Sequence, residues 1–493
     1  MGATTTKVRS ERAALIALVA GLLLSLIWLV HPWYDATNDG AMYIATTRSL
    51  LAGEGFSMLG SPFLIRPPGF SVLLAPLLAA FGTNFGVLNL FVSLWGVAAV
   101  VLFYLWLKPR TGCWLALVAA LALWLNPGFQ RLCNQVMSDV PGVTLLLACL
   151  LLERHLARKP SAKSDLLLGL AIGGAALVRS VCVLLLPAIL VARIVRRGEQ
   201  PWRVLGLRAA ALIAGTLALQ GPWSLRNTVV APPPPADQTM LYSYGTGMWH
   251  ENKGDPTSPR LPLGDVLGRF AERRGQIETT LGNRLTGSEL ELLTSAGAAV
   301  LLLCLAVSLV KRRRTEDFFC LAVLGLLAIY FNFAPRLLLP AYVLMFGTAA
   351  ELVRSGVARF RGERIATVLS CALVGSIGLK DLVPRRDWEA IERGHQQLTE
   401  LARRFEEHLE ADDVVASFRG WHYAVALDRP VYSLQFGFVR GGGPAGAEEL
   451  IDKYGIEKVV LSPIVELERQ FVPYFRAKYP VTGKDEALVF QVR

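Results

Sequence analysis

The sequence predicts a mainly α protein: a polytopic membrane helix bundle of about 11 transmembrane helices, followed by a small extracytoplasmic α/β domain. Two observations predict the bundle. Hydrophobic residues make up 53% of the 493-residue chain, and the mean hydropathy is +0.43. Apolar runs also recur near the roughly 20 residues that span a bilayer. A third observation predicts the separate domain, because acidic residues outnumber basic ones from residue 385 onward and the chain becomes hydrophilic there.

The basic clusters between the apolar runs predict the membrane topology. Lysines and arginines gather in the cytoplasmic loops of membrane proteins. If every predicted helix crosses, the clusters fall on one side, with the N-terminus in the cytoplasm and the loops 31–85 and 223–290 outside the cytoplasmic (inner) membrane. The runs 69–82 and 165–179 are either spanning or re-entrant and interfacial. The predicted helices are 13–30, 86–107, 112–126, 141–157, 165–179, 181–196, 205–222, 291–310, 318–334, 337–353 and 365–381.

The C-terminal region has its own pattern. We expect a membrane-embedded part over 1–384 and an extracytoplasmic domain over 385–493. An amphipathic helix from Trp388 precedes short apolar runs separated by helical stretches, which is typical of an α/β fold. The triplet 441–443 is a glycine loop without the spacing of a phosphate-binding fingerprint.

Composition excludes several functions. The net charge of +11 does not indicate nucleic-acid binding, because the basic residues lie in short clusters between apolar runs. The seven cysteines lie within or beside apolar segments and lack Cys-x-x-Cys spacing, so we expect neither a disulfide framework nor a structural zinc site. No cluster has the spacing of metal ligands, so no metal-binding residue is assigned and the need for a divalent-cation cofactor is left open.

The first outer loop contains a polar, aromatic and acidic stretch between two apolar blocks, which is typical of the working loop of a membrane enzyme. Asp39 opens a short amphipathic segment in it. Its carboxylate either caps free backbone amides of that segment or points into an outer cavity, where it takes a proton from an attacking hydroxyl. Asp35 is either a second carboxylate or ordinary loop polarity.

The remaining charged candidates lie at the same outer edge of the membrane. Asp139 either caps the next helix or is a second cavity carboxylate. Arg66, Arg226 and Arg336 are on the side where basic residues are disfavoured. Each either extends to the interface or holds a phosphate by bidentate hydrogen bonding. Arg179 either faces the cavity or pairs within the bundle.

Four aromatic or imidazole side chains are candidates for lining a sugar site, although such residues at membrane interfaces usually anchor the protein. They are His31, Tyr43, Trp249 and His250.

Taken together, these stretches resemble the GT-C superfamily of integral-membrane glycosyltransferases, in the branch that includes protein O-mannosyltransferases and the lipid A aminoarabinose transferases. The resemblance covers about residues 30 to 340 and rests on the order and shared side of short motifs. The matching pieces are Asp39 with Tyr43, Gly53 with Gly55, the RPPG segment from Arg66, FGTN at 81–84, Ser138-Asp139, GPW at 221–223 with Arg226-Asn227, and Arg336 to Pro340.

The resemblance implies transfer of a hexosyl or pentosyl group from a polyprenyl-phosphate donor, outside the membrane and with inversion at the anomeric carbon. By position, Asp39 is then the base or the carboxylate that orients the acceptor, and Asp139 is the second cavity carboxylate. Arg66 and Arg336 hold the lipid phosphate. The acceptor is a glycan, a lipid or a protein, and Asp39-Gly40, where protein O-mannosyltransferases commonly show Asp-Glu, counts against a protein.

Two other classes of function compete with the transferase. A lipid-carrier transporter or flippase also needs phosphate-binding arginines, but it predicts internal repeats and buried charge at the midplane, and the sequence shows no clear repeat. A structural membrane protein predicts that Asp39 and Asp139 are replaceable without loss of activity.

Overall fold

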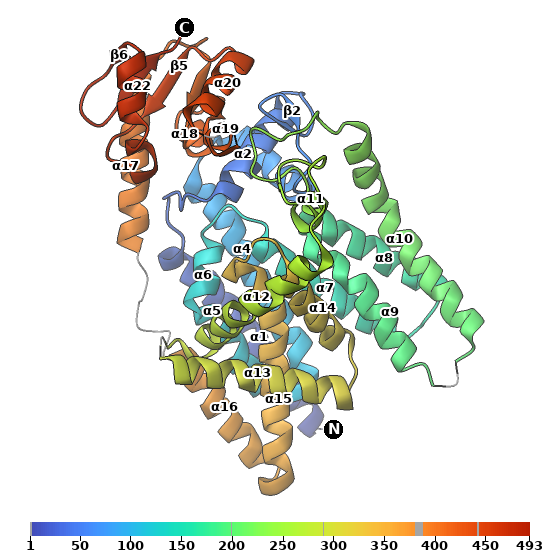
Figure 1. Cartoon of the computed structure of the whole chain (residues 1–493). Helices are drawn as coiled ribbons and strands as arrows, with labels where there is room; N and C mark the ends of the chain where they lie inside the picture. Colours follow the sequence, from blue (N-terminus) through green and yellow to red (C-terminus); the bar gives the residue numbers. More distant parts are fainter. Residues whose placement is uncertain (1, 199, 289, 380–387, 441–442) are drawn as a thin grey trace.

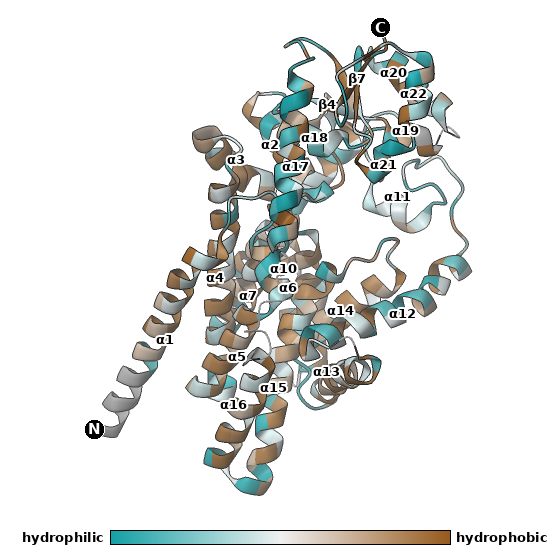
Figure 2. Cartoon of the chain, turned by 90° about the vertical axis from the view of Figure 1, so that its left-hand side faces the viewer, coloured by the Kyte–Doolittle hydropathy of each residue, from teal (hydrophilic) through white to brown (hydrophobic). Residues whose placement is uncertain are grey.

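The computed structural model describes residues 2–198, 200–288, 290–379, 388–440 and 443–493. A bundle of apolar helices forms its lower part, and a small hydrophilic unit with a β-sheet lies at the C-terminal end (Figures 1 and 2). The fold class that the sequence predicts is confirmed. The elements before residue 380 are α1 (Gly2–Leu29), α2 (Asn38–Leu51), β1 (Ser57–Met58), β2 (Ser61–Pro62), α3 (Gly69–Phe81), α4 (Phe85–Thr111), α5 (Cys113–Leu125), α6 (Pro127–Cys133), α7 (Asp139–Leu156), α8 (Ala162–Val178), the 3-10 helix η1 (Ser180–Leu184), α9 (Leu185–Val195), α10 (Trp202–Val229), α11 (Tyr244–Trp249), α12 (Leu263–Thr286), α13 (Glu291–Lys311), α14 (Thr315–Ile329), η2 (Pro335–Leu338), α15 (Leu339–Arg361) and α16 (Glu363–Leu379).

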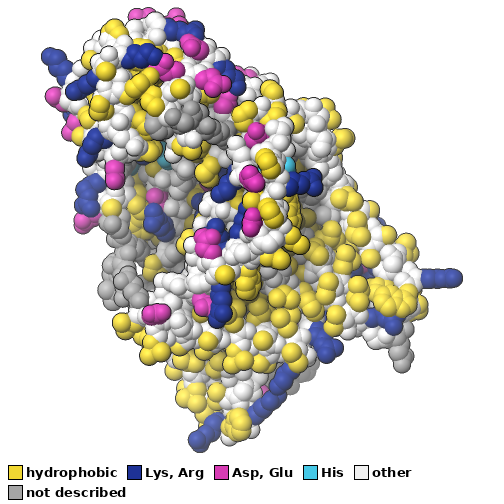
Figure 3. All heavy atoms as spheres, in the orientation of Figure 1, with side chains coloured by type: hydrophobic (Ala, Val, Ile, Leu, Met, Phe, Trp, Pro, Cys, Tyr) yellow, Lys and Arg dark blue, Asp and Glu magenta, His cyan; other side chains and the backbone are white. Residues whose placement is uncertain are grey.

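Every range predicted to be a membrane helix overlaps a helix of the structure. Figure 3 shows hydrophobic side chains gathered over the lower part of one face, below the charged C-terminal unit. Among the described residues, five helices are long and apolar enough to cross a membrane, and α5 with α6 forms a sixth candidate bent by 66°. The count of about 11 crossings remains a prediction. The five are Glu11–Leu29, Phe85–Thr111, Trp202–Val229, Glu291–Lys311 and Pro335–Arg361.

Helices α8 and α10 pack with their backbones in direct contact. A Cβ added to Gly169 would lie 2.2 Å from the carbonyl oxygen of Leu212, and one added to Gly215 would lie 2.3 Å from that of Leu166. Small residues let helices in a membrane approach this closely, because packing takes the place of the hydrophobic effect there. The run 165–179 is therefore a packed bundle helix of the structure.

Several predicted ends differ in the structure, and two of these differences lie at the end of the bundle that carries the C-terminal unit. The helix predicted over 318–334 ends at Ile329, because 330–334 turns away as a loop that reaches a cavity. The helix predicted to end at 222 continues through Pro222 to Val229.

The segment after Asp39 forms α2, as its amphipathic pattern predicts. Its N-cap is Thr37, whose hydroxyl accepts a hydrogen bond from the Gly40 amide at 3.0 Å. Asp39 lies in the first turn with its carboxylate directed elsewhere. The capping alternative for Asp39 is therefore replaced by Thr37, which leaves the carboxylate available for the cavity.

The C-terminal residues build a five-stranded sheet with strand order β4-β3-β5-β7-β6. Strand β3 pairs in parallel with β4 and β5, and β7 pairs antiparallel with β5 and β6. The predicted division at 384/385 and most of the triplet 441–443 lie outside the described residues, so the division stays a prediction. The elements are α17 (Trp388–Glu406), β3 (Val415–Ser417), α18 (Gly420–Ala426), β4 (Val431–Ser433), α19 (Gln435–Arg440), α20 (Pro444–Tyr454), β5 (Lys458–Leu461), α21 (Glu466–Arg469), α22 (Val472–Lys478), β6 (Val481–Thr482) and β7 (Leu488–Gln491).

The C-terminal unit rests on the first outer loop. Arg48 of α2 donates to the carbonyl of Ala424 in α18 at 2.8 Å and forms an ion pair with Asp428. This contact joins the unit to the helix that carries Asp39, so both parts meet at the same end of the helix bundle (Figure 1).

Candidate active site

A cavity of about 1040 Å³ is lined by residues from the helix bundle and from the C-terminal unit. Its volume is at the upper end of the range for small-molecule sites. Tyr43 and Arg66 come from the first outer loop, Arg336 from η2, Arg284 from the end of α12, and Trp421 from α18. The cavity is thus built from segments far apart in the sequence.

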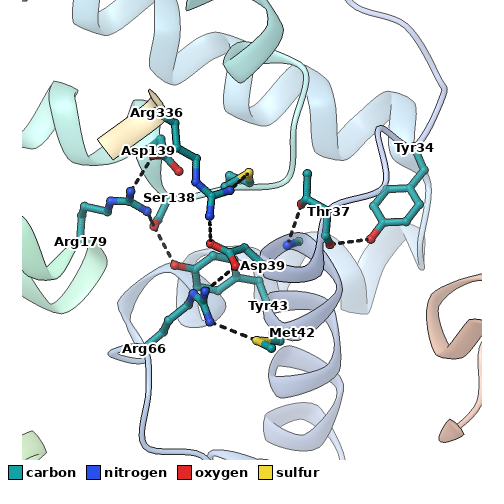
Figure 4. Close-up of polar contacts among 12 residues, drawn as sticks. Tyr34, Thr37, Asp39, Met42, Tyr43, Arg66, Ser138, Asp139, Arg179 and Arg336 are labelled. Atoms are coloured by element: carbon teal, nitrogen blue, oxygen red, sulfur yellow. Dashed lines mark hydrogen bonds and ion pairs between the residues drawn. The ribbon is translucent and has the colours of Figure 1, made fainter. Parts of the chain in front are cut away.

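Asp39 is held between two arginines in this cavity (Figure 4). Its Oδ1 accepts a hydrogen bond from Nη2 of Arg66, and its Oδ2 accepts one from Nη2 of Arg336 at 2.6 Å. The residue is 9% exposed. Burial acts to raise the pKa of Asp39, but the charges of Arg66 and Arg336 outweigh it and hold that pKa below its ordinary value. The structure therefore brings together the acid and the two cations that the sequence singles out.

The second Nη of each arginine contacts a methionine sulfur. Nη1 of Arg66 lies 3.1 Å from Sδ of Met42, and Nη1 of Arg336 lies 3.3 Å from Sδ of Met137. A thioether is a weak acceptor, so these donors are poorly satisfied. An anionic oxygen entering the cavity would be a much stronger partner for both guanidinium groups.

A second charged pair lies next to the first. Tyr43 shares a 2.7 Å hydrogen bond with the hydroxyl of Ser138, which also accepts from Nη1 of Arg179 at 3.2 Å. Nη2 of Arg179 donates to Oδ1 of Asp139 at 2.6 Å. Burial raises the pKa of Tyr43 to about 12, so the phenol keeps its proton at neutral pH. Arg179 lines the cavity and also pairs within the bundle, while Asp139 lies behind it and is not a lining residue.

Asp35 is hydrogen-bonded to two residues that line the cavity. Its carboxylate accepts from Nε of Arg131 at 2.9 Å and from the Gln135 amide. Arg131 and Gln135 line the cavity, whereas Asp35 does not. It positions two lining side chains.

Arg284 is a cavity residue that the sequence reasoning missed. In the part of the chain that the structure describes, its Nε and Nη1 are shielded from solvent and have no hydrogen-bond partner, and no carboxylate pairs with it. Its Nη2 donates to the carbonyl of Pro335 at 3.2 Å, and its guanidinium lies 5.8 Å from the ring centre of Tyr342. Burial lowers its pKa. A predicted position on the outer side was the signal that identified Arg66 and Arg336, and the same signal applies to Arg284.

Two predicted residues serve the architecture instead of lining the cavity. Arg226, in the last turn of α10, donates to the backbone carbonyls of Phe56 and Phe63 and so holds the β1–β2 hairpin. His31 is buried, with its ring 4.9 Å from that of Trp33.

Trp249 and His250 also lie outside the cavity lining. Trp249 is 45% exposed, and Nδ1 of His250 lies 2.8 Å from the carbonyl oxygen of Ser258. The prediction that both residues lie on the outer side of the membrane was not enough to place them in the cavity. Among the described residues, no group of three or more His, Cys, Asp or Glu side chains is arranged to hold a metal ion.

Comparisons with known proteins bear on this site. Residues 65–221 match the family model described as dolichyl-phosphate-mannose-protein mannosyltransferase. ArnT from Cupriavidus metallidurans bound to undecaprenyl phosphate has a similar structure, with a TM-score of 0.58, 15% identity, and coverage of 96% of this chain and 97% of that one. No curated protein matches the sequence.

A second solved structure is similar. The oligosaccharyltransferase of Archaeoglobus fulgidus, tethered with an acceptor peptide, gives a TM-score of 0.54 at 14% identity and covers 94% of this chain and 70% of that one. At 15% and 14% sequence identity, these two comparisons show that the folds are similar and nothing beyond that. The resemblance that the sequence predicts is confirmed as a likeness: residues 65–221 match the mannosyltransferase family model, and the fold is similar to those of ArnT and the archaeal oligosaccharyltransferase.

Proposed function

We propose that the chain transfers a sugar from a polyprenyl-phosphate donor to an acceptor on the outer face of the cytoplasmic membrane, with inversion at the anomeric carbon. One observation carries the proposal: Asp39 lies between Arg66 and Arg336 at a cavity, and among the described residues one donor of each arginine contacts only a thioether. This is a base beside two cations that are ready to receive a phosphate.

The phosphate of the donor takes the place of the two methionine sulfurs. Nη1 of Arg66 and Nη1 of Arg336 then donate to phosphate oxygens, and both guanidinium groups stabilise the charge that develops when the sugar–phosphate bond breaks. Arg284 adds a third cation, which has no carboxylate partner among the described residues. ArnT, whose fold is similar, was solved bound to undecaprenyl phosphate.

Asp39 takes the proton of the attacking hydroxyl. The acceptor oxygen bonds to the anomeric carbon from the face opposite the phosphate, the bond from that carbon to the phosphate oxygen breaks, and the bonding electrons leave with the phosphate. Phosphate binding also draws the positive charge of Arg66 and Arg336 away from the carboxylate, so the pKa of Asp39 rises when the donor is bound. The base is therefore strongest when the donor is in place.

The neighbouring pair supports this arrangement. Arg179 and Asp139 form an ion pair at 2.6 Å, and Arg179 reaches Tyr43 through Ser138. We assign these groups to holding α2, and therefore Asp39, in position.

The test is transfer of radiolabelled sugar by the purified protein in lipid vesicles, with polyprenyl-phosphate-linked mannose, glucose and arabinose as donors and a bacterial envelope extract as acceptor. The variants are Asp39→Asn and Arg66→Ala. Two surface variants are matched controls: Asp452→Asn, whose partner is Arg493, and Arg274→Ala, whose partner is Glu278.

We expect transfer by the native protein and both controls, and a loss of at least about 100-fold in both site variants. Full activity of Asp39→Asn would contradict the base assignment. No transfer from any donor would contradict the proposed function.

A further inference from the structure

The wall of the cavity that the C-terminal unit supplies differs in chemistry from the rest. The charged lining residues come from elements before residue 380 and are Asp39, Arg66, Arg131, Arg179, Arg284 and Arg336. The C-terminal unit contributes Trp421, Gln435 and Phe436, which are two aromatic rings and an amide. The elements before residue 380 therefore supply all the charged side chains of the lining, together with many apolar ones, and the wall from the C-terminal unit is uncharged.

The uncharged side is placed by the parallel strands of the sheet. Trp421 lies in α18, which begins three residues after β3 ends, and Gln435 opens α19 two residues after β4 ends. A Cβ on Gly420 would lie 2.6 Å from the carbonyl oxygen of Tyr432, so α18 rests directly against β4. Ligands of α/β sheets bind at the carboxyl ends of parallel strands. Here that edge of β3 and β4 faces the cavity.

A second position for a ligand at this edge, next to β5, is occupied by a side chain of the protein. Between the carboxyl ends of β3 and β5, the fully buried Glu468 accepts hydrogen bonds from the hydroxyls of Ser417 and Tyr423 and from the amide of Ser462, at 2.8, 3.0 and 2.8 Å. A ligand cannot enter there without displacing this carboxylate. The α18–α19 face remains the accessible part of the edge.

The aromatic part of this wall is held rigidly. Nε1 of Trp421 donates to the carbonyl of Gln238 at 3.1 Å, and the Gln238 side chain accepts from the Ser433 amide at 2.8 Å. The rings of Trp421 and Phe436 are 5.2 Å apart. No described residue forms a hydrogen bond with the side-chain amide of Gln435, which lines the cavity. The wall thus presents aromatic surface fixed in place beside an amide with open donors and an open acceptor.

We propose that Trp421, Gln435 and Phe436 form a subsite for an uncharged pyranose ring. The C–H face of the ring packs on the aromatic surface, and its hydroxyls exchange hydrogen bonds with the Gln435 amide. That the bound sugar takes part in a transfer reaction rests on the proposed function. The sugar is then either that of the donor or one of the acceptor, and both would make the same contacts with this wall.

The first experiment measures binding and needs no activity. Saturation-transfer NMR with methyl α-mannoside and methyl β-glucoside is recorded on the full chain in nanodiscs. Gln435→Ala should weaken binding about fivefold, the size of one lost hydrogen bond, and Trp421→Ala about tenfold or more. The controls are Gln396→Ala and Trp202→Ala, which change residues outside the cavity lining. Equal binding by native protein and Gln435→Ala, or no binding by native protein, would overturn the subsite.

The second experiment tells the two sources apart. If the subsite holds the donor sugar, Gln435→Ala weakens binding of polyprenyl-phosphate mannose but not of sugar-free polyprenyl phosphate. If it holds the acceptor, both bind as in native protein, and transfer to methyl α-mannoside needs a higher glycoside concentration. No change in either measurement overturns the inference. Gln435-dependent glycoside binding without transfer from any donor would contradict the proposed function and leave the subsite standing.

Discussion

Replacing Asp39 with asparagine separates two roles of its carboxylate. In the structure both oxygens are bonded to arginines, and the side chains of Arg66 and Arg336 are 14% and 27% exposed. Breaking a buried ion pair by removing one partner costs about 3–5 kcal/mol, and this partial exposure puts the expected cost near 3 kcal/mol. In the variant, Arg66 and Arg336 therefore have no carboxylate at position 39 to pair with.

The phosphate of the lipid carrier is the natural replacement for that acid. If its binding recovers about 1.4 kcal/mol of the loss, sugar-free undecaprenyl phosphate binds Asp39→Asn about tenfold more tightly than it binds the native protein. Sugar transfer falls in the same variant by about 100-fold to 10,000-fold, the contribution of a positioned base. Binding and transfer thus change in opposite directions.

The assay is binding of radiolabelled undecaprenyl phosphate to protein in nanodiscs, alongside transfer with a polyprenyl-phosphate sugar. Arg66→Ala is the comparison, because it removes a cation and should weaken binding as well as transfer. Weaker binding by Asp39→Asn would show that the carboxylate does not compete with phosphate for the arginines.

Three further outcomes are expected. Before the donor binds, Arg66 and Arg336 hold the pKa of Asp39 below its ordinary value, so the carboxylate stays ionised as the pH falls from 8 to about 5, and its ion pairs are lost only below about 3.8. The profile of kcat/KM reports the enzyme before the donor binds and should show no acid limb from this group in that window; a fall in kcat/KM centred near pH 6 that disappears in Asp39→Asn would contradict this. Arg284→Ala should weaken undecaprenyl phosphate binding about tenfold in the nanodisc assay, and unchanged affinity would remove Arg284 from the phosphate site. Gly215→Val should lower the thermal unfolding midpoint, because its side chain meets the Leu166 carbonyl, whereas Gly206→Val, with open space around it, should leave the midpoint near that of native protein; equal midpoints would contradict the close packing of α8 and α10.

The predicted side of the membrane on which each basic residue lies was enough to single out two of the arginines in the cavity. Basic residues on the outer side are disfavoured, so Arg66 and Arg336 stood out from the many arginines of the chain. Both are cavity-lining residues together with Asp39 and Tyr43. The helices could also be predicted from the sequence, because the length of an apolar run is a local property of the sequence.

The pairing of these residues was not accessible from the sequence. Asp39 and Arg336 are separated by 297 positions, and which acid meets which cation depends on how η2 packs against α2. Sidedness also grouped Arg226 and His250 with the site, because it places a residue on a face of the membrane and not in a cavity. The sequence did not single out Arg284, because it lies in the polar helix α12 and its burial is known only from the structure.

A structure of the protein in nanodiscs with undecaprenyl phosphate would show directly whether Arg66 and Arg336 hold the lipid phosphate. We expect the phosphate within hydrogen-bond distance of Nη1 of Arg66 and Nη1 of Arg336, with the sulfurs of Met42 and Met137 displaced from them. A phosphate bound elsewhere, with both arginines still on the methionine sulfurs, would contradict it.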